Sequence, residues 1–171
     1  MQPAVGNDKN YDPNGVEPNT ENILATYTQI IYHVVFATKH RECVLAKPRR
    51  DDLFRYIWGI VKNHEGHLFR INGVEDHVHI LTSLHPTVTL ADLVKAIKTG
   101  SAKWIKENQA FPQFDLWQEG YGAFTHSIRE KDALIEYIKN QEAHHGREDF
   151  LDEYRRLLHD AGVEFDEKYL L

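Results

Sequence analysis

The amino-acid sequence predicts an α+β domain in which a mainly antiparallel sheet is covered by helices. Segments rich in β-branched and aromatic residues alternate with segments whose apolar residues recur at helical spacing. Two of the expected strands, His67–Val74 and His77–Leu84, are separated only by a short turn, which favours antiparallel pairing. With 171 residues, 42% of them hydrophobic, the chain is long enough for one domain with a buried core.

The first half of the chain predicts one strand, one helix and the strand pair. Tyr27–Thr38 is dense in β-branched and aromatic residues, which predicts a strand buried on at least one face. Pro48 and the acidic residues after it open an amphipathic helix that closes near Gly66. The two paired strands follow directly.

The second half predicts three helices and one more strand. Thr89 is an N-cap residue for the second helix, and a further strand is expected over about Leu116–Ser127. Glu130 starts a third helix that ends around His145–Gly146, and Glu148–Asp160 is the last. Residues 1–21, rich in Asn, Asp, Pro and Gly, predict a flexible arm.

Charge is distributed unevenly along the chain. The formal net charge is −6, but residues 1–20, 21–141 and 142–171 carry −2, +1 and −5, so the acidity lies in the two tails. A central region with basic clusters remains compatible with nucleic-acid binding, although each cluster is equally typical of a solvated helix face. One cysteine, no signal-peptide pattern and no apolar run of about 20 residues predict a cytoplasmic protein.

Two patterns carry chemistry. His77 and His79 stand at positions i and i+2 of a strand, so both imidazoles leave the same face, as metal chelation requires. Tyr137 and Gln141 stand at i and i+4 of the third helix, so a phenol and an amide meet on one side. Each pattern alone is weak, because alternating polar residues are common on half-exposed strands and tyrosines are common at core edges.

Four segments in order resemble the single-tyrosine HUH transposases of the insertion-sequence 200/605 family. They are His33–Arg41, Gly73–His79, Trp117–Phe124 and Tyr137–Gln141, and the resemblance covers roughly Ile30 to Gln141. It implies a ferredoxin-like sheet, the HUH endonuclease fold, over residues 22–146, followed by a C-terminal helix and acidic tail over 147–171.

The resemblance also implies a site and a reaction. Tyr137 would be the nucleophile that forms a covalent 5′-phosphotyrosine with single-stranded DNA, and His77, His79 and Gln141 would hold Mg²⁺ or Mn²⁺. The family is dimeric, each tyrosine completing the partner's histidine pair, so a homodimer on hairpin-bearing DNA ends is expected. The sequence leaves open whether Tyr137 meets its own or the partner's histidines.

Other residues near these motifs are weaker candidates. Phosphate contacts are expected from basic residues of the first strand's end and the second helix: Lys39, Arg41, Lys98 and Lys103. His126 is expected to pack against the sheet rather than face the site. His144 and His145, one turn beyond Gln141, are alternative ligands, or bind the negative end of the helix dipole.

Three competing interpretations remain at this point. A domesticated REP-associated tyrosine transposase that processes repeated palindromes would keep the same chemistry. A relaxase or rolling-circle initiator is disfavoured by the short chain and its lone site tyrosine. A non-catalytic nucleic-acid-binding protein would not need Tyr137 at all.

Overall fold

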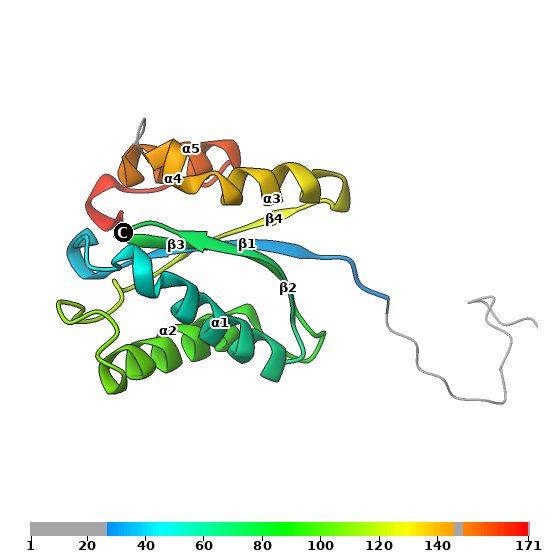
Figure 1. The fold of residues 1–171 in the computed structure, drawn as a ribbon. Helices are drawn as coiled ribbons and strands as arrows, with labels where there is room; N and C mark the ends of the chain where they lie inside the picture. Colours follow the sequence, from blue (N-terminus) through cyan, green and yellow to red (C-terminus); the bar gives the residue numbers. More distant parts are fainter. Residues whose placement is uncertain (1–26, 146–148, 171) are drawn as a thin grey trace, which may run out of the picture.

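A four-stranded antiparallel sheet lies between two layers of helices in the computed structural model, which describes residues 27–145 and 149–170 (Figure 1). The strands, in the sheet order β2-β3-β1-β4, are β1 (Ile31–Ala37), β2 (His67–Gly73), β3 (His77–Ser83) and β4 (Gly122–His126). One layer contains α1 (Lys47–Asn63) and α2 (Leu90–Glu107). The other contains α3 (Lys131–Lys139), α4 (Gln141–His145) and α5 (Phe150–Asp160). This β-α-β-β-α-β order is ferredoxin-like, as predicted.

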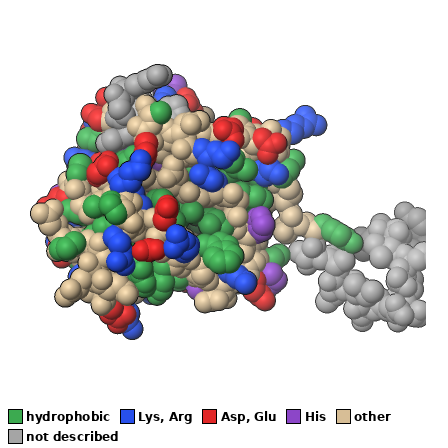
Figure 2. Space-filling model, in the orientation of Figure 1, with side chains coloured by type: hydrophobic (Ala, Val, Ile, Leu, Met, Phe, Trp, Pro, Cys, Tyr) green, Lys and Arg blue, Asp and Glu red, His purple; other side chains and the backbone are tan. Residues whose placement is uncertain are grey.

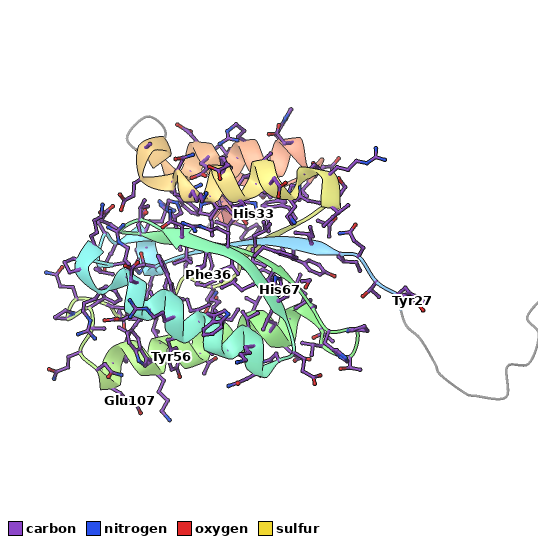
Figure 3. The ribbon with its side chains drawn as sticks, turned by 45° about the vertical axis from the view of Figure 1, so that its right-hand side comes forward. Tyr27, His33, Phe36, Tyr56, His67 and Glu107 are labelled. Carbon is purple, nitrogen blue, oxygen red and sulfur yellow. The ribbon has the colours of Figure 1, made fainter. Side chains whose placement is uncertain are left out.

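The two faces of the sheet differ in chemistry because side chains alternate along each strand. Val34 and Phe36 of β1 pair with Ile80 and Val78 of β3 and face the large apolar core under α1 and α2. His33 pairs with Leu81 and, with its neighbours on that face, meets the layer of α3–α5. Figure 3 shows His33 and Phe36 leaving β1 in opposite directions. One face is therefore an apolar core and the other carries histidines.

Most predicted elements are confirmed, and several differ from the prediction at their ends. β1 begins at Ile31 rather than Tyr27, because its pairing with β4 starts only at Ile31. α2 begins after Thr89 as predicted, and the Thr89 side chain accepts a hydrogen bond from the Asp92 backbone nitrogen at 3.1 Å. Short 3-10 helices lie at η1 (Lys39–Arg41), η2 (Ile128–Glu130) and η3 (Glu167–Tyr169).

The expected strand over Leu116–Ser127 is wrong in its first half. Trp117 makes an isolated bridge to Thr38 and donates its indole N–H to Ser101 Oγ at 2.9 Å, so it packs into the core under α2. Gly120 then adopts a positive φ of 80°, and the regular ladder begins only at Gly122. Because Trp117 packs into the core, the segment before Gly122 does not join the regular pairing between β4 and β1.

The expected continuous third helix is also interrupted. Asn72 of β2 donates its side-chain amide to the carbonyls of Ile138 and Lys139, at 2.9 and 3.0 Å. Carbonyls in the last turn of a helix lack intrahelical partners, so a side-chain donor there stabilises the end of a helix. α3 ends at Lys139, Asn140 is the cap, and Gln141 begins α4.

α5 is anchored to the histidine face by an apolar stripe. Phe150, Tyr154 and Leu158, spaced by four residues, pack on Val35, Ala37 and Phe124 of the sheet. Close approach depends on Gly122, since a Cβ there would stand 2.6 Å from the Tyr154 ring. The helix beyond the predicted domain boundary thus packs on the same sheet, although the division at residue 147 itself stays a prediction.

Two further expectations concern regions or properties beyond the sheet. The predicted arm, residues 1–21, lies outside the described residues. Within residues 27–145 and 149–170, none of the helices combines the length and apolar character that crossing a membrane requires.

Replacing Gly122 with alanine tests the contact that admits α5. The new Cβ meets the Tyr154 ring, so we expect Gly122→Ala to lower the free energy of unfolding by about 1–3 kcal/mol, measured by urea denaturation. Gly59→Ala in α1 is the matched control: a Cβ added there would have nothing within 4 Å, and the change should stabilise by about 0.5–1 kcal/mol. Equal effects from the two changes would contradict the packing described for α5.

Candidate active site

β3 brings two buried imidazoles to the same point on the histidine face. His77 and His79 are both 0% exposed, and their ring centroids lie 5.0 Å apart. Each ring is fixed through its Nδ1 atom: His77 Nδ1 lies 2.7 Å from Asp76 Oδ1, and His79 Nδ1 lies 2.9 Å from His33 Nε2. Both imidazoles are thereby held in one orientation.

The Asp76 partner also selects the tautomer of the His77 ring. A carboxylate can only accept, so His77 Nδ1 carries the proton and its Nε2 keeps a lone pair. If His79 Nδ1 donates to His33 Nε2, the Nε2 of His79 is likewise a lone-pair donor. Such outer partners are typical of metal-binding histidines, whose free ring nitrogen faces the ion.

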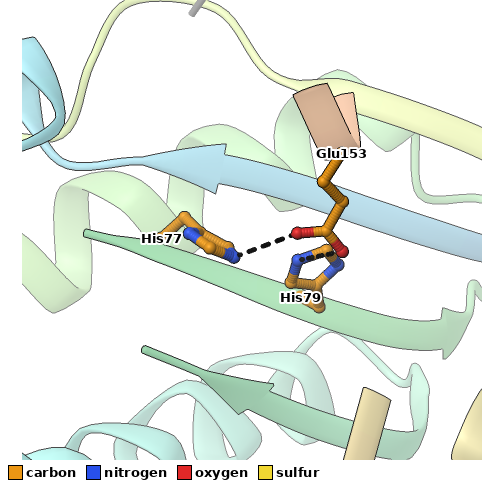
Figure 4. Close-up of side chains that lie close together, drawn as sticks. All are labelled: His77, His79 and Glu153. Atoms are coloured by element: carbon orange, nitrogen blue, oxygen red, sulfur yellow. Dashed lines mark ion pairs between the residues drawn. The ribbon is translucent and has the colours of Figure 1, made fainter. Parts of the chain in front are cut away.

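A carboxylate from α5 lies opposite both rings. Glu153, 2% exposed, places Oε2 3.6 Å from His77 Nε2 and Oε1 3.6 Å from His79 Nε2 (Figure 4). Both distances exceed a normal hydrogen bond. Two atoms that share one ion at about 2.0–2.2 Å stand roughly 3 to 3.6 Å apart, so the spacing suits a common metal ligand set.

Tyr137 and Gln141 meet the same carboxylate despite the helix break between them. The Tyr137 hydroxyl donates a short hydrogen bond to Glu153 Oε1, and Gln141 Nε2 donates to that oxygen at 3.0 Å. The Gln141 side chain is fully buried, and its Oε1 has no hydrogen-bond partner among the described residues. The four residues His77, His79, Tyr137 and Gln141 therefore do come together, with Glu153 between them.

The donors present fit a divalent cation. Ligand atoms of His77, His79 and Glu153 all lie within 4.8 Å of one another in a buried position. The unpartnered Gln141 Oε1 adds a neutral oxygen donor nearby. A buried carboxylate is costly unless a positive charge compensates it, and a cation between the two imidazoles would do so.

Tyr137 stands between opposite charges. Burial and then the Glu153 carboxylate raise the pKa of the phenol, because both disfavour the phenolate. Arg156, one helical turn beyond Glu153 on α5, acts in the opposite direction: its Nη2 lies 3.3 Å from the Tyr137 hydroxyl oxygen. The resting structure thus holds Tyr137 protonated, next to a proton acceptor and a cation.

The start of α4 is held in place by residues of α1, a helix on the other side of the sheet. Arg50 of α1, only 3% exposed, donates to Gly73 O at 3.2 Å and makes ion pairs with Glu75 at 2.5 Å and Glu142 at 3.2 Å. Lys47 holds the other oxygen of Glu142 at 2.6 Å. Because Glu142 directly follows Gln141, these contacts fix Gln141 relative to β2 and β3.

The four expected phosphate-contact residues lie in two places, α2 and η1, of which η1 follows the end of β1 that pairs with His77. Lys98 and Lys103 belong to α2, on the opposite side of the sheet from the histidines. Lys98 Nζ donates to the carbonyls of Gln118 and Gly120, both at 2.6 Å, and Lys103 lies 3.7 Å from Glu107. In η1, Lys39 pairs with Asp115 at 2.8 Å, and Arg41 has a positive φ of 56°.

Their role in binding DNA stays a prediction, and none of the four makes a described contact with Tyr137. On the face shown in Figure 2, acidic and basic side chains are interspersed. At several positions, the basic clusters seen in the sequence form ion pairs within the chain, as Lys39 does with Asp115 and Lys103 with Glu107.

The predictions for His126, His144 and His145 differ in how far the structure describes these residues. His126 of β4 lies on the histidine face, its ring centroid 6.1 Å from that of His33. It lines a cavity next to Tyr137 and is therefore closer to the site than expected. The side chains of His144 and His145 lie outside what the structure describes, so their role as alternative ligands stays a prediction.

Glu153 is the site residue that sequence reasoning missed. It belongs to an acidic segment whose composition indicates a solvated tail, and it lies beyond the motif that ends at Gln141. A signal was available: Phe150, Tyr154 and Leu158 mark the buried side of α5, and Glu153 lies on that side one residue before Tyr154.

Comparison with known proteins identifies the family. The family model for IS200-like transposases matches residues 26–141, more than half of the chain. The chain therefore belongs to the IS200-like transposase family. The ISDra2 transposase TnpA of Deinococcus radiodurans is 29% identical to it over 120 residues, which cover 66% of this chain and 84% of that protein.

Two solved structures have the same fold as this IS200-like transposase. A crystal structure of a proposed transposase from Deinococcus radiodurans R1 is 28% identical, with a TM-score of 0.54 and coverage of 68% of this chain and 95% of that chain. A REP-associated tyrosine transposase bound to a REP hairpin is 12% identical, with a TM-score of 0.55 and coverage of 72% and 75%. The latter likeness concerns the fold alone. Transposases process DNA, and the family match includes the two histidines, Tyr137 and Gln141 but ends before α5.

Removing the partner of His77 should weaken metal binding without removing a ligand. Asp76→Asn replaces the carboxylate that orients His77, so we expect Mn²⁺ affinity to fall about 10–100-fold in isothermal titration calorimetry. Asp132→Asn, whose side chain is 91% exposed, should bind Mn²⁺ as the unmodified protein does. Unchanged affinity in Asp76→Asn would contradict the orienting role.

His33 should make the metal-free protein sensitive to acid. Burial, and then the charge of His126, lower the pKa of His33 from 6.5 to about 3. Between these values the unfolded chain binds more protons, so this residue's contribution to stability is complete above pH 6.5 and is lost as the pH falls toward 3. The slope approaches about 1.4 kcal/mol per pH unit.

The measurement is urea unfolding in EDTA at several pH values. His33→Gln should lose less stability on acidification from neutral pH than the unmodified protein, whereas His159→Gln, at an 88% exposed position, should follow it. The His33 ring faces His79 of β3, His126 of β4 and Tyr137 of α3, and both variants retain these three titratable groups. Parallel pH curves for all three proteins would contradict this assignment.

Proposed function

We propose that this chain cleaves and rejoins single-stranded DNA through a covalent 5′-phosphotyrosine on Tyr137, assisted by a divalent cation. One observation carries the proposal: the Tyr137 hydroxyl and the His77–His79 pair converge on the same buried carboxylate, Glu153. A tyrosine that merely completed a core edge would not share a carboxylate with two oriented imidazoles. Membership of a transposase family supports the same reaction class.

The proposed metal ligands are His77, His79 and Gln141, joined by Glu153. Two imidazoles with oxygen donors and no cysteine favour Mg²⁺ or Mn²⁺. When bound, the cation neutralises the charge of the scissile phosphate and polarises its P–O bond. Gln141 and Glu153 reach the site from α4 and α5, so correct docking of both helices is required for it to form.

Tyr137 performs the covalent step. The phenolic proton passes to Glu153 Oε1, which already accepts it in a hydrogen bond. The hydroxyl oxygen bonds to phosphorus while the bond from phosphorus to the 3′ oxygen breaks, and that oxygen takes the proton from Glu153 and leaves as a 3′-hydroxyl. Because the phosphotyrosine is itself an ester, a second 3′-hydroxyl reverses the attack and joins new ends without an external energy source.

The site is proposed to function within one chain. The Tyr137 ring centroid lies 6.2 Å from that of His79 in the same molecule, and α5 contributes Glu153 to both. A single tyrosine holds one DNA end, so joining two ends requires two chains. We therefore propose a homodimer in which each chain contains a complete site. This differs from the exchange of tyrosines between subunits that the family resemblance implies.

The proposed substrate is single-stranded DNA with hairpin ends. The REP-associated tyrosine transposase that shares the fold is bound to a hairpin, which supports this choice. Lys39, Arg41, Lys98 and Lys103 remain proposed phosphate contacts, for DNA that passes outside the catalytic face. Processing of repeated palindromes by a domesticated enzyme would use the same residues, and the DNA flanking the gene distinguishes the two roles.

Covalent adduct formation tests the reaction. Oligonucleotides from both strands flanking the gene are incubated with Mn²⁺ or with EDTA, then analysed by denaturing gel and peptide mass spectrometry. We expect a metal-dependent adduct on Tyr137 with one strand only. Tyr137→Phe, which keeps the ring and removes the nucleophilic oxygen, should form none, whereas Tyr169→Phe in η3 should react normally. DNA binding without any adduct would instead indicate a non-catalytic binding protein.

Mixing two inactive variants tests the single-chain site. One carries His77→Ala with His79→Ala, and the other carries Tyr137→Phe. If each chain builds its own site, the mixture should remain inactive at every ratio. Recovered adduct formation would show that tyrosine and histidines come from different subunits.

A further inference from the structure

The cavity that His126 lines adjoins the Tyr137 ring. Its volume is about 390 Å³, within the range of small-molecule sites. β4 contributes Phe124, Thr125 and His126, α3 contributes Leu134 and Tyr137, and the outer turns of α5 contribute Arg156, Leu157 and Asp160. The cavity shares Tyr137 with the metal site, so whatever it holds lies next to the proposed nucleophile.

Arg156 marks the end of this cavity nearest the nucleophile. Its Nη2 lies 3.3 Å from the Tyr137 hydroxyl oxygen, and its guanidinium carbon lies 5.8 Å from the Tyr137 ring centroid. Glu153, three residues earlier on the same helix, binds the same oxygen. α5 therefore brings a proton acceptor and a cation to one phenolic oxygen.

The position of Arg156 matters because the Tyr137 hydroxyl oxygen, which it contacts, is the atom that would bond to phosphorus. The non-bridging oxygens of an attached phosphate lie one bond beyond phosphorus, so a guanidinium at hydrogen-bond distance from the phenolic oxygen also reaches one of them. Charged hydrogen bonds from arginine to phosphate are short and strong, and arginine commonly stabilises transferring phosphoryl groups.

We propose that this cavity binds the nucleotide joined to the scissile phosphate, with Arg156 holding the phosphate and the cavity walls holding the base. The inference rests on the proposed function, since it assumes that Tyr137 attacks DNA. It assigns Arg156 a catalytic role beyond the metal ligands and the nucleophile.

The remaining lining suits one nucleotide rather than a phosphate chain. Phe124, Leu134 and Leu157 offer apolar surface against which a base can pack. Glu130 and Asp160 would repel a second phosphate, while their oxygens can accept hydrogen bonds from base amino groups. His126 adds an Nε2 that is buried without a hydrogen-bond partner among the described residues.

The charge of Arg156 suits this role, because its Nη2 lies within hydrogen-bond distance of the Tyr137 hydroxyl oxygen. The same cation can therefore favour the developing phenolate before attack and the phosphotyrosine after it. No other Lys or Arg side chain in the described part of the chain lines this cavity.

Binding without cleavage is the first test. Fluorescein-labelled oligonucleotides from both strands flanking the gene are titrated in EDTA over a range of salt concentrations, with anisotropy as the readout. Arg156→Gln should bind about 3–10-fold more weakly, and the slope of log K against log salt should fall by about 0.7, as for one lost single-strand phosphate contact. Arg155→Gln is the matched control, because Arg155 instead pairs with Glu167 and Asp152. An Arg156→Gln protein with unchanged affinity and slope would overturn the proposal.

The rate of adduct formation at saturating DNA is the second test. Arg156→Gln should react about 100-fold more slowly with unchanged Mn²⁺ affinity, and Arg156→Lys should recover part of the rate. If the unmodified protein forms the adduct and Arg156→Gln matches its rate, this inference fails and the proposed function stands. If the unmodified protein forms no adduct, the proposed function fails and the assignment to the scissile phosphate fails with it; DNA binding that still depends on Arg156 would then show a phosphate contact alone.

Discussion

The burial of the Glu153 carboxylate against two imidazoles is the interaction around which the histidine face is organised. An acidic side chain that is 2% exposed must be compensated, and two helices each supply a hydrogen-bond donor. α3 supplies a phenol and α4 an amide, whereas the two ring nitrogens of β3 lie 3.6 Å away, at a spacing that suits a shared cation. Those ring nitrogens are themselves fixed by Asp76 and His33. The network specifies how three helices dock, which a purely apolar interface would leave less determined.

The two faces of the sheet differ in composition, one being an apolar core and the other carrying the buried histidines. Its face toward α1 and α2 is filled by aliphatic and aromatic side chains such as Val34, Phe36 and Ile80, which bury surface without any polar requirement. The opposite face gives up much of that burial to histidines, and apolar contacts there are divided into two small clusters. Arg50 connects the two layers, because it joins α1 to the β2–β3 turn and to α4. The helices under the apolar face thereby help to position α4 on the histidine face.

Sequence patterns predicted the elements well, because strand alternation and helical spacing are local properties. The His77–His79 pair was also visible from its spacing on one strand. The Tyr137–Gln141 pair was visible from helical spacing, although the two residues lie on either side of the break between α3 and α4. What could not be predicted depends on contacts between distant segments. Asn72 ends α3 from another strand, and Trp117 leaves the ladder to meet Ser101. Glu153 looks like part of an acidic tail until α5 is docked, and basic clusters near Lys98 and Lys39 have partners far along the chain.

The order of the elements has a consequence for synthesis. The histidines lie on β3, but Glu153 and Arg156 lie on α5, which leaves the ribosome after all four strands. Domains emerge and fold from the N-terminus, so a nascent chain can complete its sheet while the catalytic face is still uncovered. Such a chain holds imidazoles and a phenol but lacks the carboxylate that joins them. Under the proposed mechanism, the site would thus be complete only once α5 has been translated.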